Sequence, residues 1–193
     1  MKNQFKIIAL FLIGALFLTS CSSNDDGASS SQFKVNGQSY DLLPTSAVTE
    51  IKMDNVHTVQ GQIFDRSTIT IMGLTGFNFA SVSFDLYYKD GSPIAGTYNI
   101  GDTEGDNSFD FDNQLLAEQK LCLGWTSACT YSDASNGLGA NANNPTGTVT
   151  VVDNGNSNYS IQYNGDFRKY DSSFNVTGNV PVVINITSDV LIQ

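Results

Sequence analysis

Residues 158–167 read NYSIQYNGDF, and residues 176–186 read VTGNVPVVINI. In the first stretch Tyr159, Ile161 and Tyr163 alternate with polar side chains, and in the second the even-numbered positions from 180 to 186 are all Val or Ile. Successive side chains of a β-strand point to opposite faces, so this period of two predicts two strands that each bury one face. This pair is the strongest fold signal in the chain.

Shorter segments of the same kind precede this pair. Residues 146–152 are expected to pair with 158–167 through the turn sequence DNGNS, which makes a meander of at least three strands. Residues 33–40 fit a hairpin with Asn36-Gly37 as its turn, because these residues tolerate positive φ. Further strands are expected at 58–65, 68–75, 80–88 and 96–100. Residues 115–120 fit either a helical turn or the start of a strand.

These segments predict one all-β domain over residues 33–193. Roughly eight to ten strands in about 160 residues are enough for a single core. Two architectures satisfy the pattern, an antiparallel up-and-down β-barrel and a β-sandwich. The two differ in whether the sheet closes on itself.

The N-terminal region has the form of a secretory signal peptide. Lys2 and Lys6 precede an apolar run over residues 7–18, and the small residues Thr19 and Ser20 come before Cys21. A transmembrane helix needs about 20 apolar residues, so the run is too short for a permanent span. Residues 1–20 are therefore expected to be removed, and residues 21–32, which are rich in Ser and Asp, to form a flexible tether.

The sequence Leu18-Thr19-Ser20-Cys21 resembles the lipobox of bacterial lipoproteins. This resemblance implies a lipid attached at Cys21 and an outer-membrane location. The Ser and Asp residues that follow resemble the surface-export signal of Bacteroidetes lipoproteins, which implies exposure at the cell surface. The β pattern from residue 147 onward is similar to that of small lipocalin-like lipoproteins of that group. The alternatives are a secreted soluble protein and a plain solvated linker.

The charge of the chain excludes one class of partner. The formal net charge is −10, and loss of the two lysines in residues 1–20 makes it −12. Such a surface repels phosphate groups, so a nucleic-acid-binding function is not expected.

Two cysteines remain after Cys21, and an exported chain favours a disulfide between Cys122 and Cys129. On one straight strand these residues would lie about 23 Å apart on opposite faces, so a bridge requires a turn between them. Trp125 lies inside this predicted loop, where it either binds a ligand or packs into the core. An unbroken strand over 121–130 would contradict the bridge.

A second set of candidate ligand-binding residues is aromatic. Phe77, Phe79 and Tyr87 share parity and are expected on the wetter face of a hairpin, where they line a ligand site or a barrel lumen. The alternative is that a loop or helix covers them.

Acidic residues form a third candidate site. Five of them crowd one segment without a basic residue: Asp102, Glu104, Asp106, Asp110 and Asp112. Carboxylates at this density suit calcium, but the spacing is not that of an EF-hand, and a solvated acidic loop is the alternative.

Catalytic motifs are largely missing from the sequence. His57 is the only histidine, and no G-x-S-x-G motif occurs. A pair of carboxylates arranged as in a glycosidase stays a possibility, because the sequence does not show their spacing in space. The sequence therefore predicts a non-catalytic surface lipoprotein that binds a glycan or a small apolar molecule. The alternatives are an accessory subunit of an outer-membrane protein complex and a small glycan hydrolase.

Overall fold

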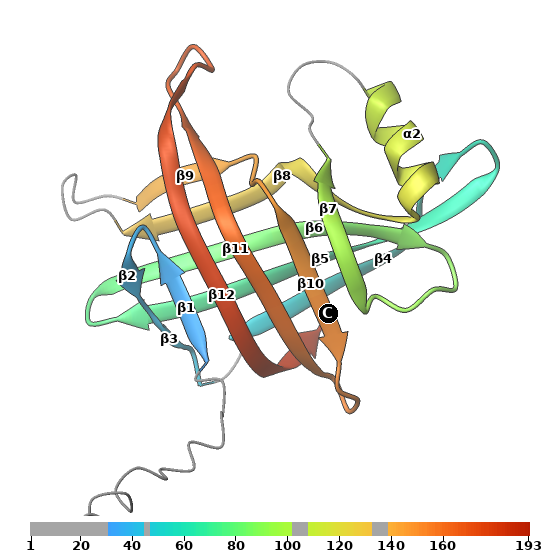
Figure 1. The fold of residues 1–193 in the computed structure, drawn as a ribbon. Helices are drawn as coiled ribbons and strands as arrows, with labels where there is room; N and C mark the ends of the chain where they lie inside the picture. Colours follow the sequence, from blue (N-terminus) through green and yellow to red (C-terminus); the bar gives the residue numbers. More distant parts are fainter. Residues whose placement is uncertain (1–30, 45–46, 102–107, 133–138) are drawn as a thin grey trace, which may run out of the picture.

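The computed structural model describes residues 31–44, 47–101, 108–132 and 139–193. Their strands form one 12-stranded sheet, and one helix lies outside it (Figure 1). The elements are β1 (Gln32–Val35), β2 (Gln38–Ser39), β3 (Asp41–Leu42), β4 (Val48–Val59), β5 (Gln62–Thr75), β6 (Asn78–Lys89), β7 (Gly96–Gly101), α2 (Ser108–Glu118), β8 (Lys120–Ser132), β9 (Gly139–Asn143), β10 (Thr148–Asp153), β11 (Asn158–Tyr170) and β12 (Val176–Ile192).

The sheet closes on itself, so the barrel alternative is the one that the chain adopts. Eight strands form the ring in the order β12, β4, β5, β6, β8, β7, β10 and β11, and β11 pairs with β12 to close it. Two contacts of the ring, β12 with β4 and β7 with β8, are parallel rather than antiparallel. A parallel neighbour needs a long crossover, and the segment that contains α2 provides it between β7 and β8.

The wall of the barrel has two tiers, because the long strands pair with different short strands along their length. On β8, residues 121–123 pair with β7 and residues 128–132 pair with β9. On β12, residues 182–185 pair with β1 and residues 190–192 pair with β4. The barrel therefore has two distinct ends. We call the end at the β5–β6, β1–β2 and β11–β12 turns the hairpin end, and the opposite one the mouth.

The core confirms the alternation read from the sequence. Tyr159, Ile161, Tyr163 and Phe167 of β11 are buried, and so are the four Val and Ile residues at even positions 180–186 of β12. Phe84 on β6 packs against β11, with ring centroids 5.0 Å from Tyr163 and 5.9 Å from Phe167. Because these rings reach across the barrel, side chains fill its interior at this level.

A second apolar cluster lies outside the barrel, beneath α2. Leu115 and Phe111 of the helix pack on Phe64, Tyr87 and Leu121 of the sheet. Residues 115–120 were predicted to form either a helical turn or the start of a strand. In the structure they contain both, because the helix ends at Glu118 and β8 begins at Lys120. Gln119 makes the junction with φ of 60° while its N–H donates to the Leu115 carbonyl at 2.8 Å.

Several predicted boundaries are corrected. The segment 58–65 is not one strand, because Gln60 and Gly61, with φ of 48° and 82°, form the turn between β4 and β5. β1 begins at Gln32, inside the predicted tether. The Asn36-Gly37 turn is confirmed, with φ of 51° and 79°. Within the described part of the chain, no helix has the length and apolarity needed to cross a membrane.

The predicted Cys122–Cys129 disulfide is wrong for this structure. Both residues are free, buried thiols on β8, which runs from Lys120 to Ser132. Cys122 pairs with Leu86 and Cys129 with Val82, so about four residues, or about 13 Å, separate them along the sheet. An irregularity between 123 and 128 shifts the register and turns both side chains into the core, although their parity differs.

Candidate ligand site at the barrel mouth

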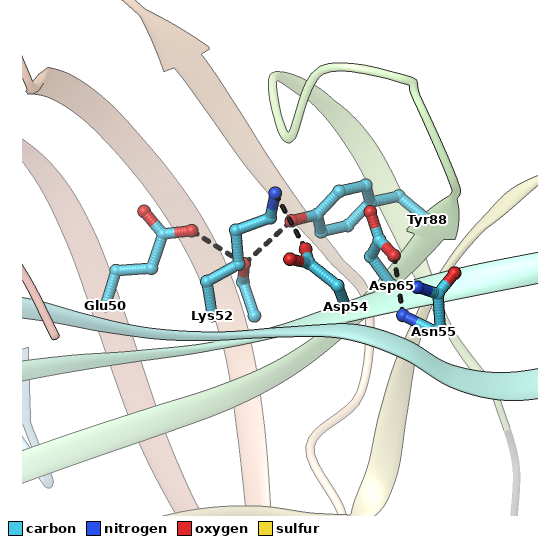
Figure 2. Close-up of polar contacts among 7 residues, drawn as sticks. Glu50, Lys52, Asp54, Asn55, Asp65 and Tyr88 are labelled. Carbon is cyan, nitrogen blue, oxygen red and sulfur yellow. Dashed lines mark hydrogen bonds and ion pairs between the residues drawn. The ribbon is translucent and has the colours of Figure 1, made fainter.

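The inward-facing side chains of β4 and β5 change from apolar to polar towards the mouth. On β4 the core residue Val48 is followed at the same parity by Glu50, Lys52 and Asp54. On β5 the core residues Ile71 and Ile69 give way to Ser67 and Asp65. Since the two strands pair antiparallel, these polar residues lie side by side at one end of the barrel (Figure 2).

The deepest part of this site is a buried hydrogen-bonded chain. Ser67 Oγ donates to Glu50 Oε1 at 2.6 Å and lies 3.0 Å from the Tyr88 hydroxyl, which therefore donates to Ser67 (Figure 2). Burial, followed by the charge of Glu50, raises the pKa of Tyr159 to about 12. Glu50 is only 3% exposed, so its carboxylate depends on the Ser67 hydroxyl rather than on water.

An ion pair lies nearer the solvent. Lys52 Nζ is 2.9 Å from Asp54 Oδ1, with 46% and 64% of the two side chains exposed. The hydrogen bond to Asp54 is the main reason that the pKa of Lys52 is raised. Because both groups face water, the pair contributes little to stability and is available to a ligand.

A bulge in β4 presents the next residues. Met53 pairs with Arg66 and His57 with Phe64, so residues 54–56 oppose the single residue Asp65. Asn55 takes φ of 54°, and its N–H donates to Asp65 Oδ1 at 3.0 Å (Figure 2). Asp65 is 3% exposed, so a buried carboxylate holds the bulge in place.

The opposite wall is the loop between β6 and β7, and Lys120 holds it. Lys120 Nζ donates to the Pro93 carbonyl at 2.5 Å and also to the Ala95 carbonyl. The Tyr98 hydroxyl donates to the Ile94 carbonyl. Gly96 has φ of 151°, and a Cβ there would lie 2.8 Å from Lys120 Cδ, so glycine leaves room for this clamp. The wall is therefore preformed.

Together the two walls enclose an open pocket of about 620 Å³. Its lining residues are Lys52, Asp54, Asn55, Asp65, Asp90, Gly91, Ser92 and Pro93. The lining has three carboxyl groups, one ammonium group and one side-chain amide, but no aromatic ring. Such a surface suits a ligand that is rich in hydroxyl groups or carries a positive charge.

The aromatic residues predicted to bind ligand are not brought together. Phe79 pairs with Leu74 at the hairpin end, whereas Tyr87 pairs with Arg66, about 27 Å further along β6. Phe77 is fully exposed in the β5–β6 turn. Tyr87 is covered by α2, as in the alternative in which a loop or helix covers these residues. Trp125 is half-exposed in the irregular part of β8.

The acidic candidates are only partly described. Asp102, Glu104 and Asp106 lie outside the described residues, and Asp110 and Asp112 are in α2. Asp112 Oδ1 is 2.6 Å from His57 Nε2, which links α2 to the end of β4. Among the residues with described side chains, no three metal-binding groups cluster. Calcium binding stays a prediction. Cys21 and the residues before it that resemble a lipobox also lie outside the described residues.

The sequence reasoning missed the mouth itself. Asp65 and Ser67 share the parity of Ile69 and Ile71, and Glu50 shares that of Val48. The available signal was that these polar side chains share the strand parity of core residues. A polar residue at such a position must find a buried partner or line a cavity.

Comparison with known proteins adds nothing to this geometry. No protein-family model, curated protein or solved structure matches the chain.

Proposed function

We propose that this protein is a lipoprotein anchored through Cys21 to the outer membrane, exposed at the cell surface, and that it binds a glycan at the mouth without catalysis. The observation that carries the binding function is the open pocket of about 620 Å³ between β4 and the β6–β7 loop. The lipobox resemblance of residues 18–21 supports the anchor.

The chemistry of the lining favours a glycan over an apolar molecule. Carboxylate and amide oxygens accept hydrogen bonds from neighbouring hydroxyl groups, while an ammonium group donates to ring or hydroxyl oxygens. Asp54, Asn55 and Asp90 supply the acceptors and Lys52 supplies the donor. The packing of Phe84 against Tyr163 and Phe167 leaves an apolar ligand no room at that level of the barrel.

The burial of two carboxylates makes them part of the framework of the mouth and leaves Asp54 and Asp90 as the carboxylates that face a ligand. Glu50 accepts a hydrogen bond from Ser67, and Asp65 accepts one from the Asn55 N–H. Both side chains are 3% exposed. A glycosidase needs two carboxyl groups that reach the scissile bond, whereas these two hold the framework of the mouth.

The test is a glycan array followed by calorimetry on the best-binding glycan. The K52M/D54N/D90N variant is expected to weaken binding by about tenfold or more, because each lost hydrogen bond to a charged group contributes about 1.5–3 kcal/mol. D41N is the matched control, since Asp41 is exposed on β3, away from the mouth.

Two outcomes would contradict the proposal. Unchanged affinity in the triple variant would show that the ligand does not bind at the mouth. Loss of affinity in Trp125→Ala alone would place the ligand at the irregular part of β8. Incubation of the wild-type protein with the same glycan is expected to release no shorter sugar, and release would favour the hydrolase.

A further inference from the structure

The hairpin end carries an apolar tip that the binding function does not use. In the sequence LTGFNF at 74–79, Phe77 is 105% exposed, Leu74 is 45% exposed and Phe79 is 39% exposed. Leu74 and Phe79 are cross-strand partners, and Phe77 lies in the turn that joins their strands, so one hairpin presents all three exposed side chains. Single exposed apolar residues are normal, but three of them within six residues of one hairpin indicate a contact surface.

The tip is held rigidly, which makes its exposure a property of the fold. β5 and β6 pair without interruption up to Thr75 and Asn78, and Gly76, with φ of 59°, and Phe77 make the turn. The Phe79 N–H donates to Ser132 Oγ at 2.9 Å, which fastens the hairpin to β8. The paired strands therefore hold the backbone of Phe77 at the end of the hairpin.

The chain enters the barrel beside this hairpin. The ring of Phe33, the second residue of β1, packs against Gly73, where a Cβ would lie 2.9 Å from Phe33 Cδ1. Gly73 is about 13 Å along the strand from Phe77. The segment from Cys21 to Gln32 spans at most about 40 Å when extended. A lipid on Cys21 therefore keeps the tip within reach of the bilayer.

Charge distinguishes this tip from the β11–β12 turn at the same end. Residues 74–79 contain no charged side chain. In the β11–β12 turn, Phe174 is 75% exposed, but Asp171 lies in the same turn. The backbone N–H of Asn175 and further hydrogen bonds lower the pKa of Asp171, so its carboxylate stays ionised and disfavours contact with lipid.

We propose that Leu74, Phe77 and Phe79 form a wedge that inserts into the interface of the bilayer that carries the lipid anchor. This inference rests on the anchor of the proposed function. One lipid-linked attachment leaves the domain free to tumble on its tether, and a second contact fixes its orientation. Asp65 and Thr75 lie about 33 Å apart along β5, so insertion of the tip directs the mouth away from the membrane.

Tryptophan fluorescence tests the wedge in the full lipidated protein. The F77W/W125F variant, whose only tryptophan is at the tip, is reconstituted in phosphatidylcholine vesicles with and without brominated acyl chains. Its emission is expected to fall by about half in the brominated vesicles, because bromine quenches only indoles at the depth of the acyl chains. F174W/W125F is the matched control, and its emission is expected to change little.

Separate readouts distinguish failure of the wedge from failure of the anchor. Flotation of wild-type protein and C21S with the vesicles reports the anchor, and a wild-type protein that does not float overturns both proposals. A floating protein whose F77W/W125F emission matches that of the control overturns the wedge alone. The F77A variant gives a further readout. If it keeps the orientation of the wild-type protein on the vesicles but no longer co-purifies with an envelope protein, the wedge is overturned and the accessory-subunit alternative is favoured.

Discussion

The residues of the mouth divide into a buried group and an exposed group. Glu50, Asp65 and Ser67 are almost completely buried and hydrogen-bonded to other groups of the protein. Lys52 and Asp54 are about half exposed and face the pocket. The buried group therefore holds the geometry, and the exposed group is free to exchange its water for a ligand.

The two core cysteines give a prediction at the scale of single residues. Burial raises the pKa of both Cys122 and Cys129 to about 12. At pH 8 about one thiol in ten thousand would then be ionised, and the thiolate is the reactive form. In the C21S protein, without reductant, we expect no reaction with a thiol reagent under native conditions and two modified thiols per chain in urea. Intact mass after alkylation measures both numbers.

A chain that shows no modification in urea until a reductant is added would contradict the free thiols. The C21S/C122S variant is the matched control, because it is expected to carry one modification in urea with or without reductant.

At the scale of elements, the β4 bulge links a buried carboxylate to the shape of the pocket. Three residues of β4 oppose Asp65, and the carboxylate of Asp65 accepts the N–H of Asn55 in the middle of the bulge. Asp54 and Asn55 reach the pocket because the strand leaves its regular path there. Bulges are a usual means of turning side chains towards a site.

Asp65→Ala is expected to destabilise the protein and to weaken the ligand site together. Loss of the acceptor leaves the Asn55 N–H without its partner, at a cost of about 1–3 kcal/mol in the free energy of unfolding. Asp65→Asn keeps an acceptor oxygen and is the matched control, with a smaller loss. Urea denaturation measures stability, and calorimetry measures glycan affinity. Equal stability of the alanine and asparagine variants would show that the carboxylate does not hold the bulge.

At the scale of the whole molecule, the barrel is asymmetric from end to end. The mouth carries carboxylates, a lysine and buried hydroxyl groups, and the hairpin end carries exposed apolar tips. Between them lies a core with several buried acidic groups that stay protonated at neutral pH, among them Tyr98, Tyr159, Tyr163 and the two thiols.

These groups predict that stability falls as the pH rises above about 9. Burial raises the pKa of Tyr98 and Tyr163, and it raises that of Tyr159 to about 12. In the unfolded chain these groups lose their protons near their ordinary pKa values, so the native state binds more protons. Each such group then lowers the free energy of unfolding by about 1.4 kcal/mol per pH unit. Lys120 opposes this trend, since burial lowers its pKa, but it is a single group.

Urea midpoints at pH 7.5, 9 and 10.5 measure the effect. Tyr98→Phe removes one of the titrating groups and is expected to give a shallower decline, although it also loses the bond to the Ile94 carbonyl. A midpoint that is the same at all three pH values would contradict the prediction.

Local pattern was sufficient for much of the fold. The alternation of Tyr159, Ile161 and Tyr163 predicted β11, and the Asn36-Gly37 pair predicted the first turn, because both signals act between neighbouring residues. The strand at 58–65 was wrong because Gln60-Gly61 is a weaker turn signal than Asn-Gly. The disulfide was wrong because residues 120–132 form one strand paired with β6, which keeps Cys122 and Cys129 about 13 Å apart along the sheet.

The sequence by itself determined the alternating strands and most of the turns, since each depends on residues close together in the chain. Only the tertiary structure decided that the sheet closes, that α2 covers Tyr87, and that the polar residues of β4 and β5 meet the β6–β7 loop at one mouth. These features depend on strand register, and register follows from pairing between residues far apart in the chain.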